Sequence, residues 1–175
     1  KLFQITDEFA DPLSRHYRID GSVGFVDRSQ DYIAGVNPVN GQPVTAAVKD
    51  RFVLFRTGFT GDTTRFQEWG PFQGKRFNVS ATYGADAGGD LSGNLLTYTA
   101  DFRAYKQLTR RSLLAWRISG FDSAGGRPAY YSLGGINQLR GYSFRDFFGE
   151  RVVWSNLELR FPLVDQLRFP FGAIR

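Results

Sequence analysis

One arginine and one glutamate carry the most specific chemical pattern in this sequence. Arg140 lies in a tetrad that follows a pair of glycines, and Glu158 lies in the next segment where polar and apolar residues alternate. The whole pattern consists of Gly134, Gly135, Leu139, Arg140, Gly141, Tyr142, Asn156, Glu158, Arg160 and Pro162. A guanidinium and a carboxylate can satisfy each other through two parallel hydrogen bonds. We therefore predict an ion pair that fixes a loop to the strand that follows it.

Such a pair matters most where the loop is shielded from water, because an arginine removed from bulk water is costly unless it is paired. The lumen of a closed β-barrel is such a place, and there the pair would pin a long loop. Its chemistry would be structural and electrostatic rather than catalytic. A simpler interpretation is an ordinary β-turn, in which Gly141 supplies a permissive φ and Tyr142 packs.

The composition argues against catalysis and against a metal site. The 175 residues include no cysteine, which excludes disulfides, thiolate metal sites and cysteine nucleophiles. His16 is the single histidine and cannot build a histidine cluster. No nucleophile–base pair is recognisable, so we expect no enzyme, no cofactor and no bound metal. The cluster from Asp86 to Asp90 could suit calcium, but a plain hairpin loop is favoured.

The net charge of +5 and the 16% of aromatic residues could suit a protein that binds nucleic acid. However, the longest basic run is the pair Arg110-Arg111, and the arginines are otherwise spread at strand-like intervals. We therefore expect solvated or ion-paired arginines and no nucleic-acid partner.

The elements that must position Arg140 and Glu158 are predicted to be β-strands, because hydrophobic residues recur with a period of two. Strands are predicted at residues 16–27, 51–58, 75–85, 94–106, 112–121 and 151–161, with another near Leu167 and an eighth if Leu2–Phe9 contributes. Most are about ten to thirteen residues long, whereas a usual strand has about five or six. No segment of convincing length has a helical period, and none is long and apolar enough for a transmembrane helix.

Each predicted strand has one apolar face, and this combination of length and alternation is typical of transmembrane β-barrels. Aromatic residues on these faces fit a lipid-facing surface: Tyr17, Phe25, Tyr83, Tyr98, Phe102 and Trp116. The opposite parity carries Asp101, Arg103, Arg117, Glu158 and Arg160, which could form a polar network or line an aqueous passage. The network is favoured because buried arginines normally find partners. A soluble β-sandwich core would also explain the aromatic residues, but long strands and inward charges favour the barrel.

The connections alternate in length along the chain. Residues 107–111 and 162–166 are short, whereas residues 28–49 and 122–149 are long, as expected for the two sides of an outer-membrane barrel. Residues 59–74 are the exception, being long for a periplasmic turn. About seven strands leave open edges that would aggregate, and the sequence starts without a signal peptide. We therefore expect a piece of a larger barrel.

At the tetrad the chain resembles the BamA/TamA superfamily, also known as bacterial surface antigen barrels. A motif of the form [VL]-R-G-[FY] in the sixth extracellular loop corresponds to residues 139–142, and its acidic partner corresponds to Glu158. The family turn D-x-x-R…P-x-x-G corresponds to Asp62, Arg65, Pro71 and Gly74. The resemblance implies that residues 1–175 are part of a sixteen-stranded barrel in the bacterial outer membrane, with residues 122–149 folded into its lumen.

The resemblance also implies a function: the insertion, assembly or translocation of proteins at the bacterial outer membrane. Outer-membrane lipid, client outer-membrane or secreted proteins, and soluble domains outside this sequence would then be partners. An alternative is a barrel that anchors a periplasmic propeller or a surface complex without insertase activity. It is suggested because residues 56–74 are similar to a subgroup fused to a WD-repeat-like propeller. A third and weaker interpretation is a soluble, secreted β-sandwich.

Overall fold

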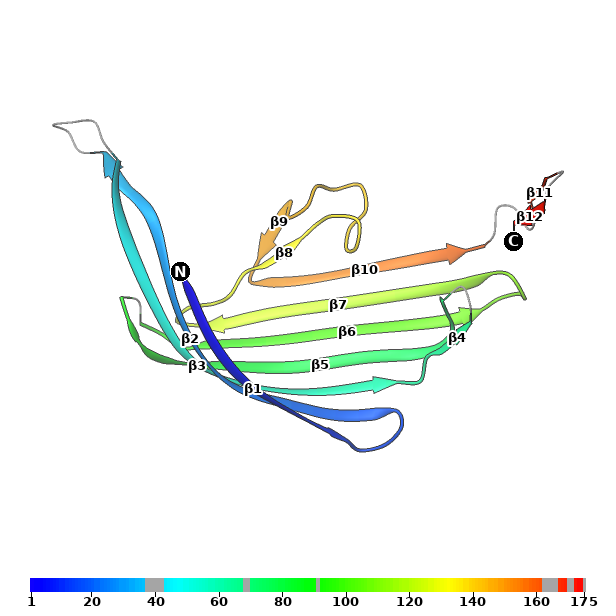
Figure 1. Ribbon diagram of the computed structural model, residues 1–175, viewed down its shortest axis with the longest axis horizontal. Helices are drawn as coiled ribbons and strands as arrows, with labels where there is room; N and C mark the ends of the chain where they lie inside the picture. Colours follow the sequence, from blue (N-terminus) through cyan, green and yellow to red (C-terminus); the bar gives the residue numbers. More distant parts are fainter. Residues whose placement is uncertain (37–42, 68–69, 91, 162–166, 170–171, 175) are drawn as a thin grey trace.

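The main strands form one antiparallel meander, as the computed structural model of the protein shows (Figure 1). The structure describes residues 1–36, 43–67, 70–90, 92–161, 167–169 and 172–174. The main strands are β1 (Leu2–Pro12), β2 (Tyr17–Val36), β3 (Pro43–Asp62), β5 (Gly70–Gly89), β6 (Leu95–Gln107), β7 (Leu113–Gly125) and β10 (Arg151–Arg160). The short strands are β4 (Arg65–Gln67), β8 (Tyr131–Leu133), β9 (Phe147–Gly149), β11 (Leu167–Phe169) and β12 (Gly172–Ile174). The predicted all-β class is confirmed.

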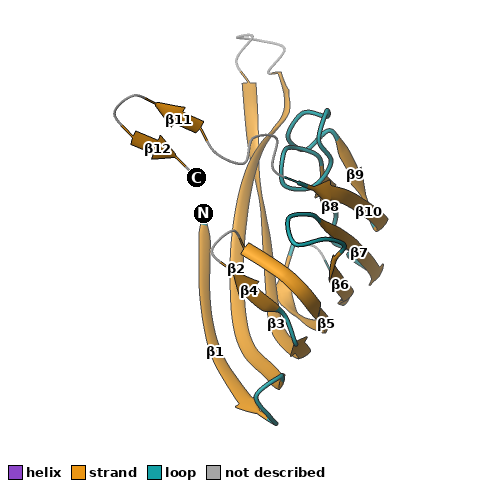
Figure 2. Ribbon diagram, turned by 90° about the vertical axis from the view of Figure 1, so that its right-hand side faces the viewer, coloured by secondary structure: helices purple, strands orange, loops and turns teal. Residues whose placement is uncertain are grey.

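The main sheet has the order β1-β2-β3-β5-β6-β7-β10, and β4 is added by pairing with β5. Two separate hairpins, β8–β9 and β11–β12, lie outside this sheet. The sheet is curved but not closed, because its edge strands β1 and β10 do not pair with each other in the described part of the chain (Figure 2). No helix among the described residues is long and apolar enough to cross a membrane.

Several predicted boundaries were wrong, because β2, β3 and β5 each extend over 20 residues. Most of the predicted loop 28–49 belongs to the β2–β3 hairpin, whose register continues to Val36 and Pro43. The segment 59–74 contains the end of β3, strand β4 and the start of β5, and β5 also takes up part of the predicted loop 86–93. Residues at these ends lose the alternation of polar and apolar side chains. Pairing with the neighbouring strand nevertheless satisfies their backbone groups.

The two faces of the sheet differ in chemistry, as the alternation predicts. The cross-strand register aligns one row of the apolar face: Ile19, Phe59, Val79, Ala100, Gly120 and Val153. The opposite, polar face carries Asp20, Arg56, Ser80, Thr99, Arg117 and Glu158. The large side chains of the apolar face are exposed, with Val153 at 74% and Leu157 at 68%.

Buried apolar side chains are few in the described part of the chain, and they do not lie on the apolar face. They are Phe52, Ala115, Leu133 and Trp154. Phe52, Ala115 and Trp154 have the parity of the polar face, and Leu133 belongs to β8. The small core is therefore on the polar side of the sheet, where the segment between β7 and β10 covers it.

Gly74 lies where β5 leaves its short partner β4 and joins the main sheet. Its φ is +107°, and a Cβ atom there would overlap the carbonyl group of Thr63. This close approach lets the backbone N–H of Thr63 donate to the carbonyl of Lys75 at 2.8 Å. The sequence motif thus requires glycine for two reasons, the left-handed φ and the lack of space.

We predict that Gly74→Ala lowers the free energy of unfolding more than Gly70→Ala does. Gly70 has a similar φ of +112°, but a Cβ atom there would meet nothing within 4 Å, so it reports the cost of the φ angle alone. That cost is of order 1–3 kcal/mol. Urea unfolding of the folded protein should show at least about 1 kcal/mol of additional loss for Gly74→Ala, from the steric overlap. Equal losses would contradict the close approach.

Candidate functional site

The candidate site is the contact between the polar face and the long loop, defined as residues 126–150 between β7 and β10. The loop carries the β8–β9 hairpin and is seen beside the edge strand β10 in Figure 1. Its start differs from the predicted range 122–149, since residues 122–125 are still part of β7. Two strand side chains hold its backbone: Asn156 Nδ2 donates to Gln138 O at 2.6 Å, and Arg117 Nη1 donates to Asn137 O at 3.4 Å.

The glycine pair allows the loop to fold back on itself. Gly134 and Gly135 have φ angles of +137° and +93°, and a side chain on Gly134 would overlap the carbonyl of Ser143. The backbone N–H of Gly134 donates to Gln138 Oε1 at 3.0 Å, and Gln138 Nε2 donates to the hydroxyl of Tyr131 at 2.9 Å. The side chain of Gln138 therefore stabilises the turn, while its backbone carbonyl accepts the hydrogen bond from Asn156 of β10.

The tetrad has the features of a turn, and in addition it reaches the sheet. Gly141 has a φ of +92° and Tyr142 packs edge-on against Phe147, with ring centroids 5.0 Å apart. Both features fit the simple β-turn interpretation. The side chain of Arg140, however, extends to β10, where its Nη2 lies 3.1 Å from Glu158 Oε1. The two side chains are therefore close enough to form an ion pair between the long loop and β10.

Glu158 is shared between two arginines. Its Oε2 accepts from Arg160 Nε at 2.9 Å and Nη2 at 2.7 Å, while its Oε1 faces Arg140. The side chain of Glu158 is 24% exposed and that of Arg140 is 67% exposed. An ion pair with this much water contact contributes about 0–1 kcal/mol. The backbone bonds from Asn156 and Arg117 must therefore supply part of the loop attachment.

A polar network lies next to this pair on β6 and β7. Asp101 binds two arginines, with Arg103 Nε at 2.7 Å from Oδ1 and Arg117 Nη2 at 2.6 Å from Oδ2. The guanidinium of Arg117 also stacks on the ring of Trp154, 4.5 Å from its centroid. Asp101, Arg103 and Arg117 thus form an ion-pair network on the polar face. Trp154 was not singled out from the sequence, because nothing in a single strand indicates which cation will cover it.

A second attachment of the long loop was missed by the sequence analysis. Arg127, at the start of the loop, contacts Asp50 of β3 with Nη2 at 2.5 Å from Oδ1. Arg28 of β2 binds the other oxygen of Asp50 at 2.6 Å, and the guanidinium of Arg127 covers the ring of Phe52 at 4.7 Å. Asp50 is only 3% exposed. The curvature of the sheet brings these groups together. No local sequence pattern indicates this contact, because the residues lie far apart in the chain.

The second motif lies at the end of β3, in β4 and at the start of β5, and its residues are Asp62, Arg65, Pro71 and Gly74. Asp62 Oδ1 accepts from the backbone N–H of Thr64 at 2.9 Å, and Asp62 Oδ2 lies 3.7 Å from Arg76 Nε. In the β4–β5 hairpin, Arg65 lies opposite Gln73, and Pro71 lies opposite Phe66. The motif therefore builds a turn, in which the ion pair of Asp62 is made with Arg76. Pro162 of the first motif lies outside the described residues.

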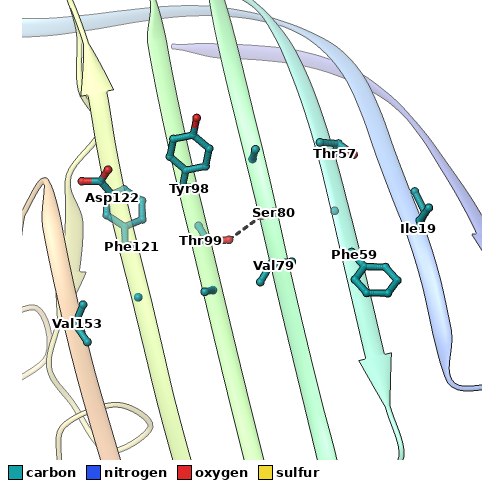
Figure 3. Close-up of a pocket in the computed structure, with 14 residues that line it drawn as sticks. Ile19, Thr57, Phe59, Val79, Ser80, Tyr98, Thr99, Phe121, Asp122 and Val153 are labelled. Carbon is teal, nitrogen blue, oxygen red and sulfur yellow. Dashed lines mark hydrogen bonds between the residues drawn. The ribbon is translucent and has the colours of Figure 1, made fainter.

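The apolar face contains a hollow of about 680 Å³ on the side opposite the long loop. Figure 3 shows the side chains around it, including Phe59, Val79, Tyr98 and Val153. Ala100 and Gly120 form part of its lining, and they lie side by side in the cross-strand register. The hollow arises because small residues on β6 and β7 are surrounded by larger ones on the neighbouring strands.

The chemistry available at the candidate site is ion pairing and hydrogen bonding. Within the described residues no group of three or more His, Cys, Asp and Glu side chains could hold a metal ion.

No protein-family model matches this chain, and no curated protein matches its sequence.

We predict that Asp50→Asn loosens the start of the long loop. The variant removes the charge of Asp50 from the contact with Arg127. Hydrogen bonds to charged groups contribute about 1.5–3 kcal/mol, so amide exchange in residues 126–131 should accelerate about tenfold or more. The amide of Ala129, which donates to Ser123 Oγ at 2.8 Å, is a suitable reporter in hydrogen–deuterium exchange.

Asp27→Asn is the matched control for this measurement. Asp27 pairs with Arg51 at 2.9 Å on the same two strands, but it has the parity of the apolar face and does not contact the loop. Its loss should leave loop exchange unchanged. Equal exchange rates in the two variants would contradict the attachment.

Proposed function

We propose that this chain is part of an outer-membrane β-barrel of the BamA/TamA superfamily, acting in the insertion, assembly or translocation of proteins at the bacterial outer membrane. The observation that carries the proposal is the pair between Arg140 of the long loop and Glu158 of β10, made at 3.1 Å across the polar face. It supports the proposal because the family resemblance rests on the same two residues and assigns them the same contact.

The apolar face supports a membrane location. Side chains of β2 on this face run from Tyr17 to Phe25, roughly 27 Å of extended strand. The apolar band of outer-membrane barrels is about 25 Å tall. Ion pairs lie on the same face beyond this band, between Asp27 and Arg51 at 2.9 Å and between Asp122 and Arg151 at 2.8 Å. In water such exposed apolar side chains would favour aggregation, whereas lipid chains would cover them and fill the hollow between them.

The open edges support a larger barrel. The outer edges of β1 and β10 have no strand partner in the described residues, and unpaired strand edges promote aggregation. A sixteen-stranded barrel supplies partners for both edges. The lumen would then lie on the polar face, with the long loop inside it.

The work of such a barrel requires neither a cofactor nor a covalent step. The long loop is attached at its start by Arg127 and near its tip by Arg140, so it braces strands β3 and β10 from inside. We infer that this brace keeps the strands in register while client proteins, whether outer-membrane or secreted, interact with the barrel.

Accessibility of single cysteines tests the membrane location, and residues 1–175 include no cysteine that would interfere. We expect Val153→Cys and Leu157→Cys to be protected from a water-soluble maleimide in intact outer membranes. Arg56→Cys, at an exposed position on the polar face of β3, should react, provided that the protein retains its fold. A soluble β-sheet would predict that all three cysteines react, since Val153 and Leu157 are among the most exposed side chains of the described residues and Arg56 is exposed as well.

Replacement of Arg140 tests the functional role of the loop. We expect Arg140→Ala to reduce the amount of correctly folded client protein in the outer membrane, with almost unchanged strand content, because the ion pair itself is worth only about 1 kcal/mol or less. The charge exchange Arg140→Glu with Glu158→Arg should restore part of the activity. Normal client levels and normal loop protection in Arg140→Ala would count against the proposal.

A further inference from the structure

A pocket of about 180 Å³ lies between the long loop and the polar face. Its charged and amide side chains come from β6, β7, β10 and the loop: Arg103, Arg117, Asn156, Glu158, Arg160 and Arg140. The guanidinium groups of the four arginines and the carboxylate of Glu158 therefore line the same pocket. Asp101, which binds Arg103 and Arg117 from the side, adds a second negative charge. Four positive charges against two negative ones leave the pocket with a net charge of +2.

The backbone register forces these positive charges together. Arg103 pairs directly with Arg117 on β7 and with Arg76 on β5, so three arginines lie side by side across the strands of the polar face. Like charges directly opposite each other are destabilising in a sheet. Asp101 offsets part of this repulsion, and a bound anion would offset more. Stacking of Arg117 on Trp154 holds one guanidinium in place before any ligand arrives.

From this arrangement we propose that the pocket binds a phosphate group. Guanidiniums bind phosphate oxygens through charge-assisted hydrogen bonds, and a dianion matches the excess charge. Arg140 contacts Glu158 through Nη2, and a guanidinium has five N–H donors, so Arg140 can bind the anion and keep its ion pair. The bound phosphate therefore links the loop to β6 and β7. This inference goes beyond the proposed function, because it requires only the loop and three strands.

The test is calorimetric titration of the folded, detergent-solubilised full-length protein with inorganic phosphate, at constant ionic strength in chloride. We expect saturable binding that Arg103→Gln and Arg117→Gln each weaken about tenfold or more, as expected for the loss of a charged hydrogen-bond donor. Arg103→Lys retains the positive charge and should keep part of the affinity. Arg56→Gln is the matched control, since Arg56 lies on the polar face and pairs with Asp20 at 3.5 Å but does not line the pocket.

A second titration with glycerol phosphate distinguishes two sources of the same group. Tighter binding of inorganic phosphate would assign the site to the free ion, and tighter binding of glycerol phosphate would assign it to a lipid headgroup. Amide exchange in residues 136–142 should become slower when the ligand is bound. Unchanged amide exchange in the strands of each variant without ligand shows that the variant is folded. Absence of binding by both compounds, or equal affinity in Arg103→Gln, Arg117→Gln and Arg56→Gln, would overturn the proposal, whatever the protein does in the membrane.

Discussion

Sharing of carboxylates between arginines is the interaction on which the polar side of this structure depends. Asp20, Asp50, Asp101 and Glu158 are each approached by two guanidiniums, and the second arginine usually comes from another strand or from the long loop. Asp50 and Glu158 join the long loop to strands with which it does not pair, whereas Asp20 and Asp101 add side-chain links between strands that are already paired. A guanidinium suits this task because it is planar, always charged and rich in donors.

The distribution of apolar residues follows from the same division into faces. Because the polar face contains the shared carboxylates, the large apolar side chains lie on the opposite face, and few apolar residues are buried in the described part of the chain. A protein in water normally buries such a surface against a second layer. Here the layer on the polar side is the long loop, and we propose that lipid is the layer on the apolar side.

The long loop connects these two features, because it covers the polar face without being part of the main sheet. Its two attachments differ in exposure, as Asp50 is buried whereas Arg140 is largely in contact with solvent. The attachment at Asp50 is therefore the stronger candidate for a permanent anchor, and the one at Glu158 is the easier to release or to reinforce with an anion. This asymmetry is consistent with a loop that is fixed at one end and adjustable near its tip.

Local alternation in the sequence by itself determined which segments form the main strands and how their side chains separate into two faces, because side chains of a strand point to opposite sides with a period of two. It also put Asp101, Arg103 and Arg117 on the same face. The motif resemblance indicated Arg140 and Glu158 as partners. Tertiary structure alone decided the 20-residue lengths of β2, β3 and β5, the pairing of Asp62 with Arg76 and the contact between Arg127 and Asp50. These features depend on cross-strand register, on sheet curvature and on the path of the loop. Residues far apart in the chain set all three together, so no single segment contains the information.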